Sequence, residues 1–195
     1  MKYFKHRVNT LEELRQTPKG YGVEIDLRPG ADDVILHHDP FSDGPTFEEW
    51  LAEYQHNGII LNVKSEGIEK RCLELLDSHG VSNFFFLDVS MPMTIKMTQQ
   101  GFHKFAVRYS VFEPIEAVLK FVGRADWIWV DSFTGFYLPQ ADYQQLRKHF
   151  NLCLVSPELV GFDRSQIKQY VGELNGIKID AVCTKIPEFW MEALN

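Results

Sequence analysis

The stretch YGVEIDLRPGADDVILHHDP, residues 21–40, joins an apolar run, a Pro-Gly turn and a second apolar run that ends in two histidines and an acid. Within the first run, Glu24 and Asp26 are two residues apart. Side chains at i and i+2 of a strand point to the same face, so both carboxylates share one face and the apolar residues take the other. The pattern predicts a strand with an acidic face, followed by a returning segment that ends at His38.

Two interpretations of this acidic face compete. If the face looks into the mouth of a barrel, the carboxylates repel each other unless a cation lies between them. Hard oxygen ligands of this kind suit Mg²⁺ or Ca²⁺. In the alternative, the acids belong to an edge strand and face water. The spacing alone favours neither interpretation.

The composition restricts the class of protein. The chain has 195 residues, a net charge of −7 and 45% hydrophobic residues, as in a globular domain. The acidic balance argues against a nucleic-acid partner, which requires a basic face. No apolar run approaches the roughly 18–20 residues of a membrane span, and the N-terminus has no apolar core of a secretory signal. We therefore expect a cytoplasmic protein without a membrane span.

Short apolar runs alternate with segments of helical spacing along the whole chain. Strands are predicted at residues 3–6, 22–28 with the extension 34–38, 59–64, 84–89, 105–110, 127–132, 152–156 and 181–184. Helices are predicted at residues 10–16, 46–54, 67–78, 92–99, 114–122, 141–149 and 165–174. Thr10 and Thr46 are each followed three residues later by a glutamate, which is the pattern of a capping box.

Alternating strands and helices predict right-handed βαβ units and an α/β fold with a parallel sheet. Eight strands with seven intervening helices match a compact (β/α)8 TIM barrel, and we expect residues 1–195 to form this single domain. An open doubly wound sheet is the alternative. It is disfavoured as a nucleotide-binding fold because no GxGxxG motif follows the first strand.

Polar residues gather where the predicted strands end, and in a parallel barrel these ends form the rim that carries the active site. The residues at these ends are His6, Arg7, Glu24, Asp26, His38, Asn62, Lys64, Asp88, Arg108, Asp131, Ser132, Ser156, Glu158, Thr184 and Lys185. Both charge signs and two histidines in one such set favour a functional site over chance.

The histidines and the basic residues suggest the chemistry of this rim. His37 and His38 are adjacent and point in opposite directions, so at most one of them serves the site. His6 and a second histidine beside an acid pair suggest general acid–base catalysis near neutral pH. Arg7, Lys64 and Arg108 can hold an anion, although each is also a common surface residue.

These motifs resemble those of the glycerophosphodiester phosphodiesterase family of TIM barrels. The matching residues are His6-Arg7, Asn9-Thr10, Glu24-Ile25-Asp26, His38-Asp39-Pro40 and Lys64, with weaker matches at Arg108-Tyr109-Ser110 and Thr184-Lys185-Ile186-Pro187. The resemblance spans the chain, but its specific motifs lie in roughly the first third.

The resemblance implies a phosphoric diester hydrolase of lipid metabolism that acts on a small-molecule phosphodiester. It places one divalent cation, Mg²⁺ or Ca²⁺, on Glu24, Asp26 and Asn62. It makes His6 and His38 the general acid and base. The remaining catalytic and substrate-binding roles fall to Arg7 and Lys64, which neutralise phosphate charge, and to Asp88, Arg108 and Lys185, which contact substrate.

The sequence departs from the family pattern in several places. Val8 replaces the glycine after His-Arg, and the glutamate before Asn9-Thr10 is missing. Asn62 stands where the third strand normally carries a glutamate ligand, and only residues 41–45 separate the His38 motif from the next helix, where the family has an insertion. A neutral amide can coordinate through oxygen, but it contributes less charge to the cation.

Three functions therefore remain open. The leading hypothesis is a cation-dependent phosphodiesterase for a glycerophosphodiester-like or sugar-linked diester. The second is a barrel that binds a phosphorylated ligand without turning it over. The third is a metal-dependent sugar-phosphate isomerase or lyase with Asp88 or Glu158 as base. No sequence motif supports this third hypothesis. The sequence leaves the oligomeric state open.

Overall fold

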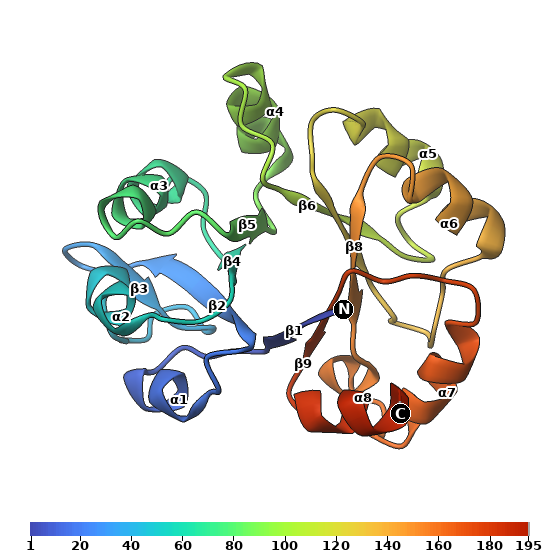
Figure 1. Ribbon diagram of the computed structural model, residues 1–195. Coiled ribbons are helices and arrows are strands. Elements are labelled where there is room, and N and C mark those ends of the chain that lie inside the picture. The colour runs from blue at the N-terminus through green and yellow to red at the C-terminus, as the bar shows by residue number, and fades with distance from the viewer. Residues whose placement is uncertain (195) are drawn as a thin grey trace. The chain divides into compact units, whose positions relative to one another are not determined.

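A computed structural model of the protein describes residues 1–194 and divides into two compact units. One unit is Phe4–Gly101, and the other consists of residues 1–3 and the chain from Phe102 onward. Both units alternate strands with helices (Figure 1). The prediction of one domain over residues 1–195 stays a prediction.

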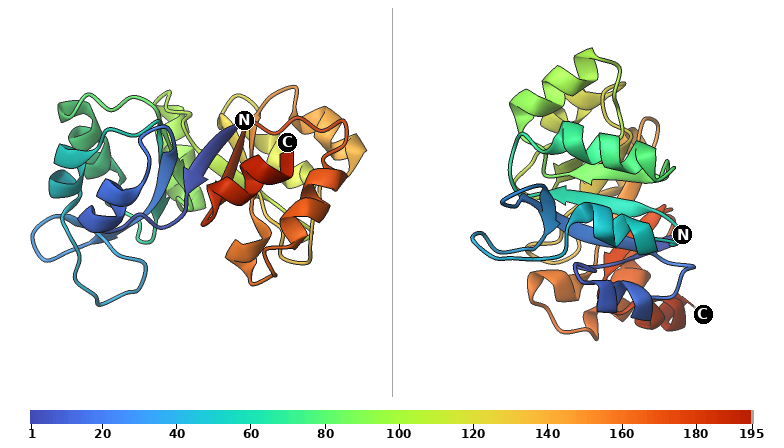
Figure 2. Two further views of the ribbon diagram at one scale, coloured as in Figure 1. Left: turned by 60° about the horizontal axis from the view of Figure 1, so that its bottom comes forward. Right: turned by 90° about the vertical axis from the view of Figure 1, so that its left-hand side faces the viewer.

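The unit Phe4–Gly101 contains four parallel strands in the order β5-β4-β2-β1, with β3 antiparallel to β2. Helices α1, α2 and α3 lie along one side of these strands (Figures 1 and 2). The elements are β1 (Lys2–Lys5), α1 (Leu11–Gln16), β2 (Gly22–Pro29), β3 (Val34–Leu36), α2 (Phe47–Glu53), β4 (Ile59–Val63), α3 (Glu69–Ser78), β5 (Phe84–Leu87) and α4 (Met91–Gln99).

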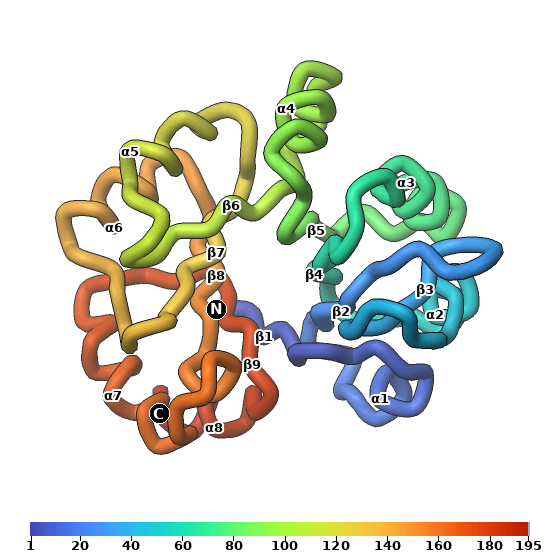
Figure 3. Tube along the Cα trace, turned by 180° about the vertical axis from the view of Figure 1, so that it is seen from behind, coloured from blue at the N-terminus to red at the C-terminus, as the bar shows by residue number. Residues whose placement is uncertain are grey.

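The other unit contains four parallel strands in the order β9-β8-β7-β6, seen from behind in Figure 3. The backbone N–H of Lys2 donates to the carbonyl oxygen of Asp180, which places the start of β1 beside β9. The elements are β6 (Ala106–Tyr109), α5 (Ile115–Val118), the 3-10 helix η1 (Leu119–Phe121), β7 (Trp127–Val130), α6 (Gln140–Leu146), β8 (Asn151–Val155), the 3-10 helix η2 (Pro157–Val160), α7 (Gln166–Glu173), β9 (Ala181–Thr184) and α8 (Pro187–Leu194).

The strand count confirms the predicted fold class, a (β/α)8 TIM barrel. The eight predicted strands are all present, and the returning extension is the separate strand β3. Helix α8 was not predicted. It begins at a proline and is anchored by Trp190, whose indole N–H donates to Ser156 Oγ at 2.7 Å. Among residues 1–194, no helix is long and apolar enough to cross a membrane.

Strand β2 is buried on both faces, so the interpretation of a water-facing edge strand is wrong. It lies between β1 and β4 in the sheet. Its apolar side chains Val23, Ile25 and Leu27 are 0% exposed, and the carboxylates Glu24 and Asp26 on the opposite face are 1% exposed. Burial of two carboxylates is unfavourable unless each finds a charged or hydrogen-bonded partner.

The helices that follow β1 and β3 are fixed at their first turns. Thr10 and Thr46 each accept a hydrogen bond from the backbone of the glutamate three residues on, and both predicted capping boxes are confirmed. Trp50 of α2 is fully buried and donates its indole N–H to the carbonyl oxygen of Val8 at 3.1 Å. This bond ties the loop after β1, where His6 and Arg7 lie, to the helix that follows β3.

Gly44 shapes the short segment that leads from β3 back to α2. A Cβ at this position would overlap the carbonyl oxygen of Leu36 on β3. We predict that Gly44→Ala lowers the free energy of unfolding by about 2 kcal/mol, the usual scale of overpacking. Urea unfolding measures the change. Gly20→Ala is the control, because nothing lies within 4 Å of a Cβ there. Equal stabilities of the two variants would contradict the packing argument.

Candidate active site

Glu24 is held at the centre of the site by groups from two other segments. Its Oε1 accepts a hydrogen bond from Asn62 Nδ2 of β4 at 3.0 Å. Its Oε2 accepts one from the backbone N–H of Arg7 at 2.8 Å. Arg7 has a φ of 55°, in the left-handed region that few non-glycine residues adopt. This conformation occurs where the loop aims its backbone N–H at the buried carboxylate.

Asp26, on the same face of β2, is held by an amide and a lysine. Asn9 forms a pair of hydrogen bonds with it: Nδ2 donates to Asp26 Oδ2 at 2.9 Å, and the backbone N–H of Asp26 donates to Asn9 Oδ1 at 2.9 Å. The ammonium of Lys64, just beyond β4, lies 3.1 Å from Asp26 Oδ1. Arg7 Nε lies 3.8 Å from Oδ2. Asp26 therefore has the Lys64 ion pair at one carboxylate oxygen and the double hydrogen bond to Asn9 at the other oxygen and the backbone.

At Glu24 the effects that raise the pKa of the carboxyl outweigh those that lower it. Burial raises the pKa of this carboxyl from 4.5 to about 7, and the negative charge of Asp26 adds to the rise. Hydrogen bonds from Asn62 and the Arg7 backbone and the charge of Lys64 oppose the shift without cancelling it. The site therefore favours added positive charge, either as a proton on Glu24 or as a cation beside it.

Both candidate acid–base histidines lie just after strands that pair with β2. His6 follows β1 and places Nε2 3.8 Å from Glu24 Oε2, with its side chain 14% exposed. His38 follows β3, and its carbonyl oxygen accepts from the guanidinium of Arg28, at the end of β2, at 2.8 and 3.0 Å. His37, the residue before it, donates its backbone N–H to the carbonyl oxygen of Asp26.

His38 forms a dyad with the next residue. Its Nδ1 lies 2.8 Å from Asp39 Oδ1, and the hydrogen bond lowers the pKa of the Asp39 carboxyl. A carboxylate only accepts hydrogen bonds, so Nδ1 carries a proton and Nε2 is the atom available for proton transfer. The His38 side chain is 38% exposed, so Nε2 can meet a ligand from solvent.

The structure brings most of the predicted site residues into one set of contacts. His6, Arg7, Asn62 and Lys64 all contact Glu24 or Asp26. Among the residues predicted to contact substrate, Asp88 follows β5 of the same unit with a φ of 61°. Arg108 pairs with Asp131, and the backbone N–H of Lys185 donates to Glu158 Oε1 at 2.9 Å, both within the other unit. Their contact with substrate stays a prediction.

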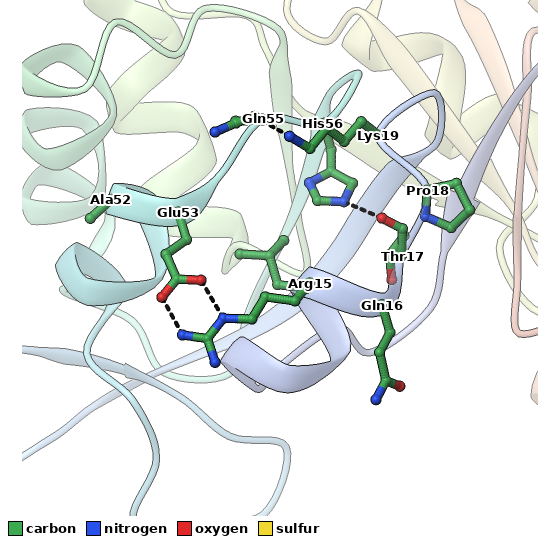
Figure 4. Close-up of a pocket in the computed structure, with 10 residues that line it drawn as sticks. Arg15, Gln16, Thr17, Pro18, Lys19, Ala52, Glu53, Gln55 and His56 are labelled. Carbon is green, nitrogen blue, oxygen red and sulfur yellow. Dashed lines mark hydrogen bonds and ion pairs between the residues drawn. The ribbon is translucent and has the colours of Figure 1, made fainter.

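A separate cavity of about 540 Å³ lies at the other end of the strands (Figure 4). Arg15 at its wall forms an ion pair with Glu53, and His56 Nε2 bonds the carbonyl oxygen of Thr17 at 2.8 Å. The wall comes from the last turns of α1 and α2 and from the segments that lead into β2 and β4. Active sites of (β/α)8 barrels lie at the opposite, carboxyl-terminal end of the strands, and no predicted site residue lines this cavity.

The acid pair and Asn62 offer the oxygen ligands that a hard divalent cation prefers. Asp26 and Asn62 are register partners on β2 and β4, and Asn62 Oδ1 is buried without a hydrogen-bond partner. An orphaned amide oxygen beside two carboxylates is a suitable ligand set for Mg²⁺ or Ca²⁺. Within residues 1–194, no cluster of three or more His, Cys, Asp or Glu side chains is arranged to hold a metal. Two carboxylates and one amide predict low affinity.

The sequence matches no family model and no curated protein. Solved structures do match. A glycerophosphodiester phosphodiesterase from Agrobacterium tumefaciens is 15% identical, with a TM-score of 0.69 over 97% of this chain and 99% of that one. Two such proteins from Parabacteroides distasonis are 14% and 13% identical, with TM-scores of 0.69 and 0.62, over 99% of this chain and 85% and 96% of theirs.

This chain has the fold of the glycerophosphodiester phosphodiesterases. The resemblance predicted from the motifs in residues 6–64 therefore extends over nearly the whole chain in three dimensions.

Asn9, Arg28 and Asp39 have roles in the site that the sequence does not predict, although Asn9 and Asp39 lie in the quoted motifs. Asn9 braces Asp26, Arg28 holds the carbonyl of His38, and Asp39 orients its ring. The His-Asp dipeptide was a usable signal for the dyad. No sequence signal connects Asn9 to Asp26, because the contact joins residues 17 positions apart.

The raised pKa of Glu24 predicts a pH-dependent stability of the cation-free protein. A carboxyl whose pKa is higher in the folded state stabilises it below the unfolded pKa of 4.5, and this contribution is lost as the pH rises toward about 7. Between pH 5 and 8 in chelator, we expect wild type to lose about 3 kcal/mol of unfolding free energy relative to Glu24→Gln. Urea unfolding at both pH values measures it.

Glu116→Gln, at an exposed position, is the matched control and should follow the wild type. Parallel pH profiles for wild type and Glu24→Gln would show that Glu24 does not titrate in this range.

Proposed function

We propose that the protein is a divalent-cation-dependent phosphoric diester hydrolase that acts on a glycerophosphodiester-like or sugar-linked phosphodiester. The observation that carries the proposal is the buried pair Glu24 and Asp26, flanked by His6 and Lys64, which directly follow the carboxyl ends of β1 and β4. The three named structural neighbours are glycerophosphodiester phosphodiesterases, which supports this class of reaction. A charged, mostly enclosed cluster with both signs suits a phosphoryl group.

In this proposal the two histidines move protons. His38 Nε2, with the ring oriented by Asp39, takes the proton from the attacking hydroxyl of the substrate. His6, beside Glu24, delivers a proton to the departing oxygen. The two rings differ in their neighbours: one faces an exposed carboxylate and the other a buried one. This difference supports separate roles as base and acid.

In this proposal the cation and the basic side chains neutralise the negative charge of the phosphoryl group. Glu24, Asp26 and Asn62 would hold a Mg²⁺ or Ca²⁺ ion, which polarises the phosphoryl oxygens when bound. Arg7, whose side chain is 43% exposed, and Lys64 supply further positive charge for the developing anion.

A second function is a barrel that binds a phosphorylated ligand without hydrolysing it. The amide of Asn62 in place of a third carboxylate favours this function, because a weakly held cation polarises a phosphoryl group less often. The basic residues Arg7 and Lys64 are sufficient to bind an anion without turnover.

A panel assay separates the two functions. Hydrolysis of a chromogenic phosphodiester is measured with Mg²⁺, Ca²⁺ or Mn²⁺ and with chelator. The enzyme proposal expects turnover that requires a cation. No turnover with any cation, together with binding of a non-hydrolysable phosphodiester that weakens in Arg7→Ala, would favour the binding function.

The proposed acid–base roles predict large kinetic defects. Replacing either His6 or His38 by alanine should lower kcat by about 10²–10⁴-fold, the range for a lost general acid or base. The folded state should remain intact in both variants, as measured by circular dichroism and melting. His149→Ala, at an exposed position far along the chain, is the matched control. Wild-type turnover in both site variants would exclude this mechanism.

The amide at position 62 predicts a gain of cation affinity on substitution. Asn62→Glu adds a third carboxylate to the ligand set, so Mg²⁺ or Ca²⁺ should bind about tenfold more tightly, about 1.4 kcal/mol. In chelator, the three acids repel, and the variant should melt below wild type. Calorimetric titration and melting curves measure both effects. Unchanged affinity would show that the amide does not face the cation.

A further inference from the structure

Each oxygen of the buried acid pair has a close protein partner, at 2.8 to 3.1 Å. Glu24 is met by the Asn62 amide and by the Arg7 backbone, and Asp26 by the Asn9 amide and the Lys64 ammonium. A divalent cation on this pair competes with these partners for the carboxylate oxygens, and at Asp26 Oδ1, which accepts no hydrogen bond, it competes with the Lys64 ammonium. Which partner yields determines how cation binding changes the rest of the site.

Three of the four partners are fixed. The Arg7 donor is a backbone N–H, and Asn9 is held by its double hydrogen bond to Asp26. Asn62 is 7% exposed and lies inside strand β4. Moving any of these would disturb the loop after β1 or the sheet itself.

Lys64 is the partner that can leave. Its backbone is fixed by a hydrogen bond from its N–H to the carbonyl oxygen of Leu27, but it lies beyond the end of β4. Its side chain is 18% exposed and reaches Asp26 along a flexible four-carbon stem. A cation and an ammonium on the same carboxylate also repel each other, so the arrival of the one drives out the other.

We propose that Lys64 is an internal counter-ion of Asp26 that a divalent cation displaces and thereby releases to bind the phosphate group of the substrate. The inference rests on the proposed function for the identity of that substrate. It goes beyond the proposed function because one lysine has two successive partners, an acid of the protein and then a phosphate. Without a cation Lys64 neutralises Asp26, and with one it is free for the ligand.

This exchange couples cation binding to phosphate binding. Since Lys64 competes with the cation, it weakens cation affinity in the absence of ligand. Since a bound cation frees Lys64, it strengthens phosphate affinity. By linkage, a phosphate ligand strengthens cation affinity by the same factor. The site would then assemble only when both the cation and the anionic ligand are present.

The direct test compares wild type with Lys64→Met, which keeps much of the stem and removes the charge. Calorimetric titration with Mg²⁺ alone should show about tenfold tighter binding by the variant. In chelator, the variant should melt below wild type, because Asp26 loses its ion pair. Lys70→Met is the matched control, since Lys70 lies 3.8 Å from Glu74 on the exposed surface of α3. Unchanged or weaker Mg²⁺ binding in Lys64→Met would overturn the inference.

Lys64→Gln guards against a variant that fails to fold, because an amide can still donate a hydrogen bond to Asp26. It should show the same direction of change in Mg²⁺ affinity. If wild type binds no Mg²⁺ but either variant does, competition by Lys64 is supported. If neither wild type nor the variants bind Mg²⁺, Mn²⁺ or Ca²⁺, the inference fails.

The coupling is tested with dimethyl phosphate as the probe. Saturating Mg²⁺ should tighten its binding to wild type by about tenfold, and this gain should shrink in Lys64→Met. An equal gain in both proteins would overturn the release of Lys64. These binding results do not depend on turnover: a protein that shows the exchange but hydrolyses no diester would refute the proposed hydrolase while leaving the inference standing.

Discussion

Two carboxylates of β2, Glu24 and Asp26, are buried side by side, and the rest of the candidate site compensates for them. A buried charge is strongly unfavourable unless it is paired and hydrogen-bonded. Three of the oxygens therefore accept hydrogen bonds, from one backbone N–H and two side-chain amides, and the fourth, Asp26 Oδ1, forms an ion pair with the Lys64 ammonium. The compensation is incomplete, as the raised pKa of Glu24 indicates. This residual negative potential is the physical reason to expect a cation.

The conformations of the loops around the acid pair also serve the need of the buried carboxylates for hydrogen-bond donors. Arg7 takes a left-handed backbone conformation as it gives its N–H to Glu24, and Asn9 crosses to the next strand to brace Asp26. Trp50 then ties this loop to α2 through the carbonyl of Val8. On the other side, Arg28 binds the carbonyl of His38. The candidate acid–base residues are thus carried by loops whose shape depends on the acids.

Much of this architecture could be predicted from the sequence, because it depends on local patterns. The strands follow from short apolar runs, the first turns of α1 and α2 from capping boxes, and the shared face of Glu24 and Asp26 from their spacing. Burial of the acids could not be predicted, since it depends on which strands flank β2. Helix α8 could not be predicted from local patterns, because the hydrogen bond from Trp190 to Ser156 that holds it joins residues far apart in the sequence. The partners of the acid pair were missed for the same reason.

The central claim is that the acid pair on β2 is a cation site from which Lys64 can be displaced. A crystal structure of the protein grown with Mn²⁺, with anomalous scattering recorded at the manganese edge, tests it most directly. The account predicts one anomalous peak bound by Glu24, Asp26 and Asn62 oxygens, with the Lys64 ammonium turned away from Asp26. A map without a peak at the pair, in which Lys64 still contacts Asp26, would contradict it.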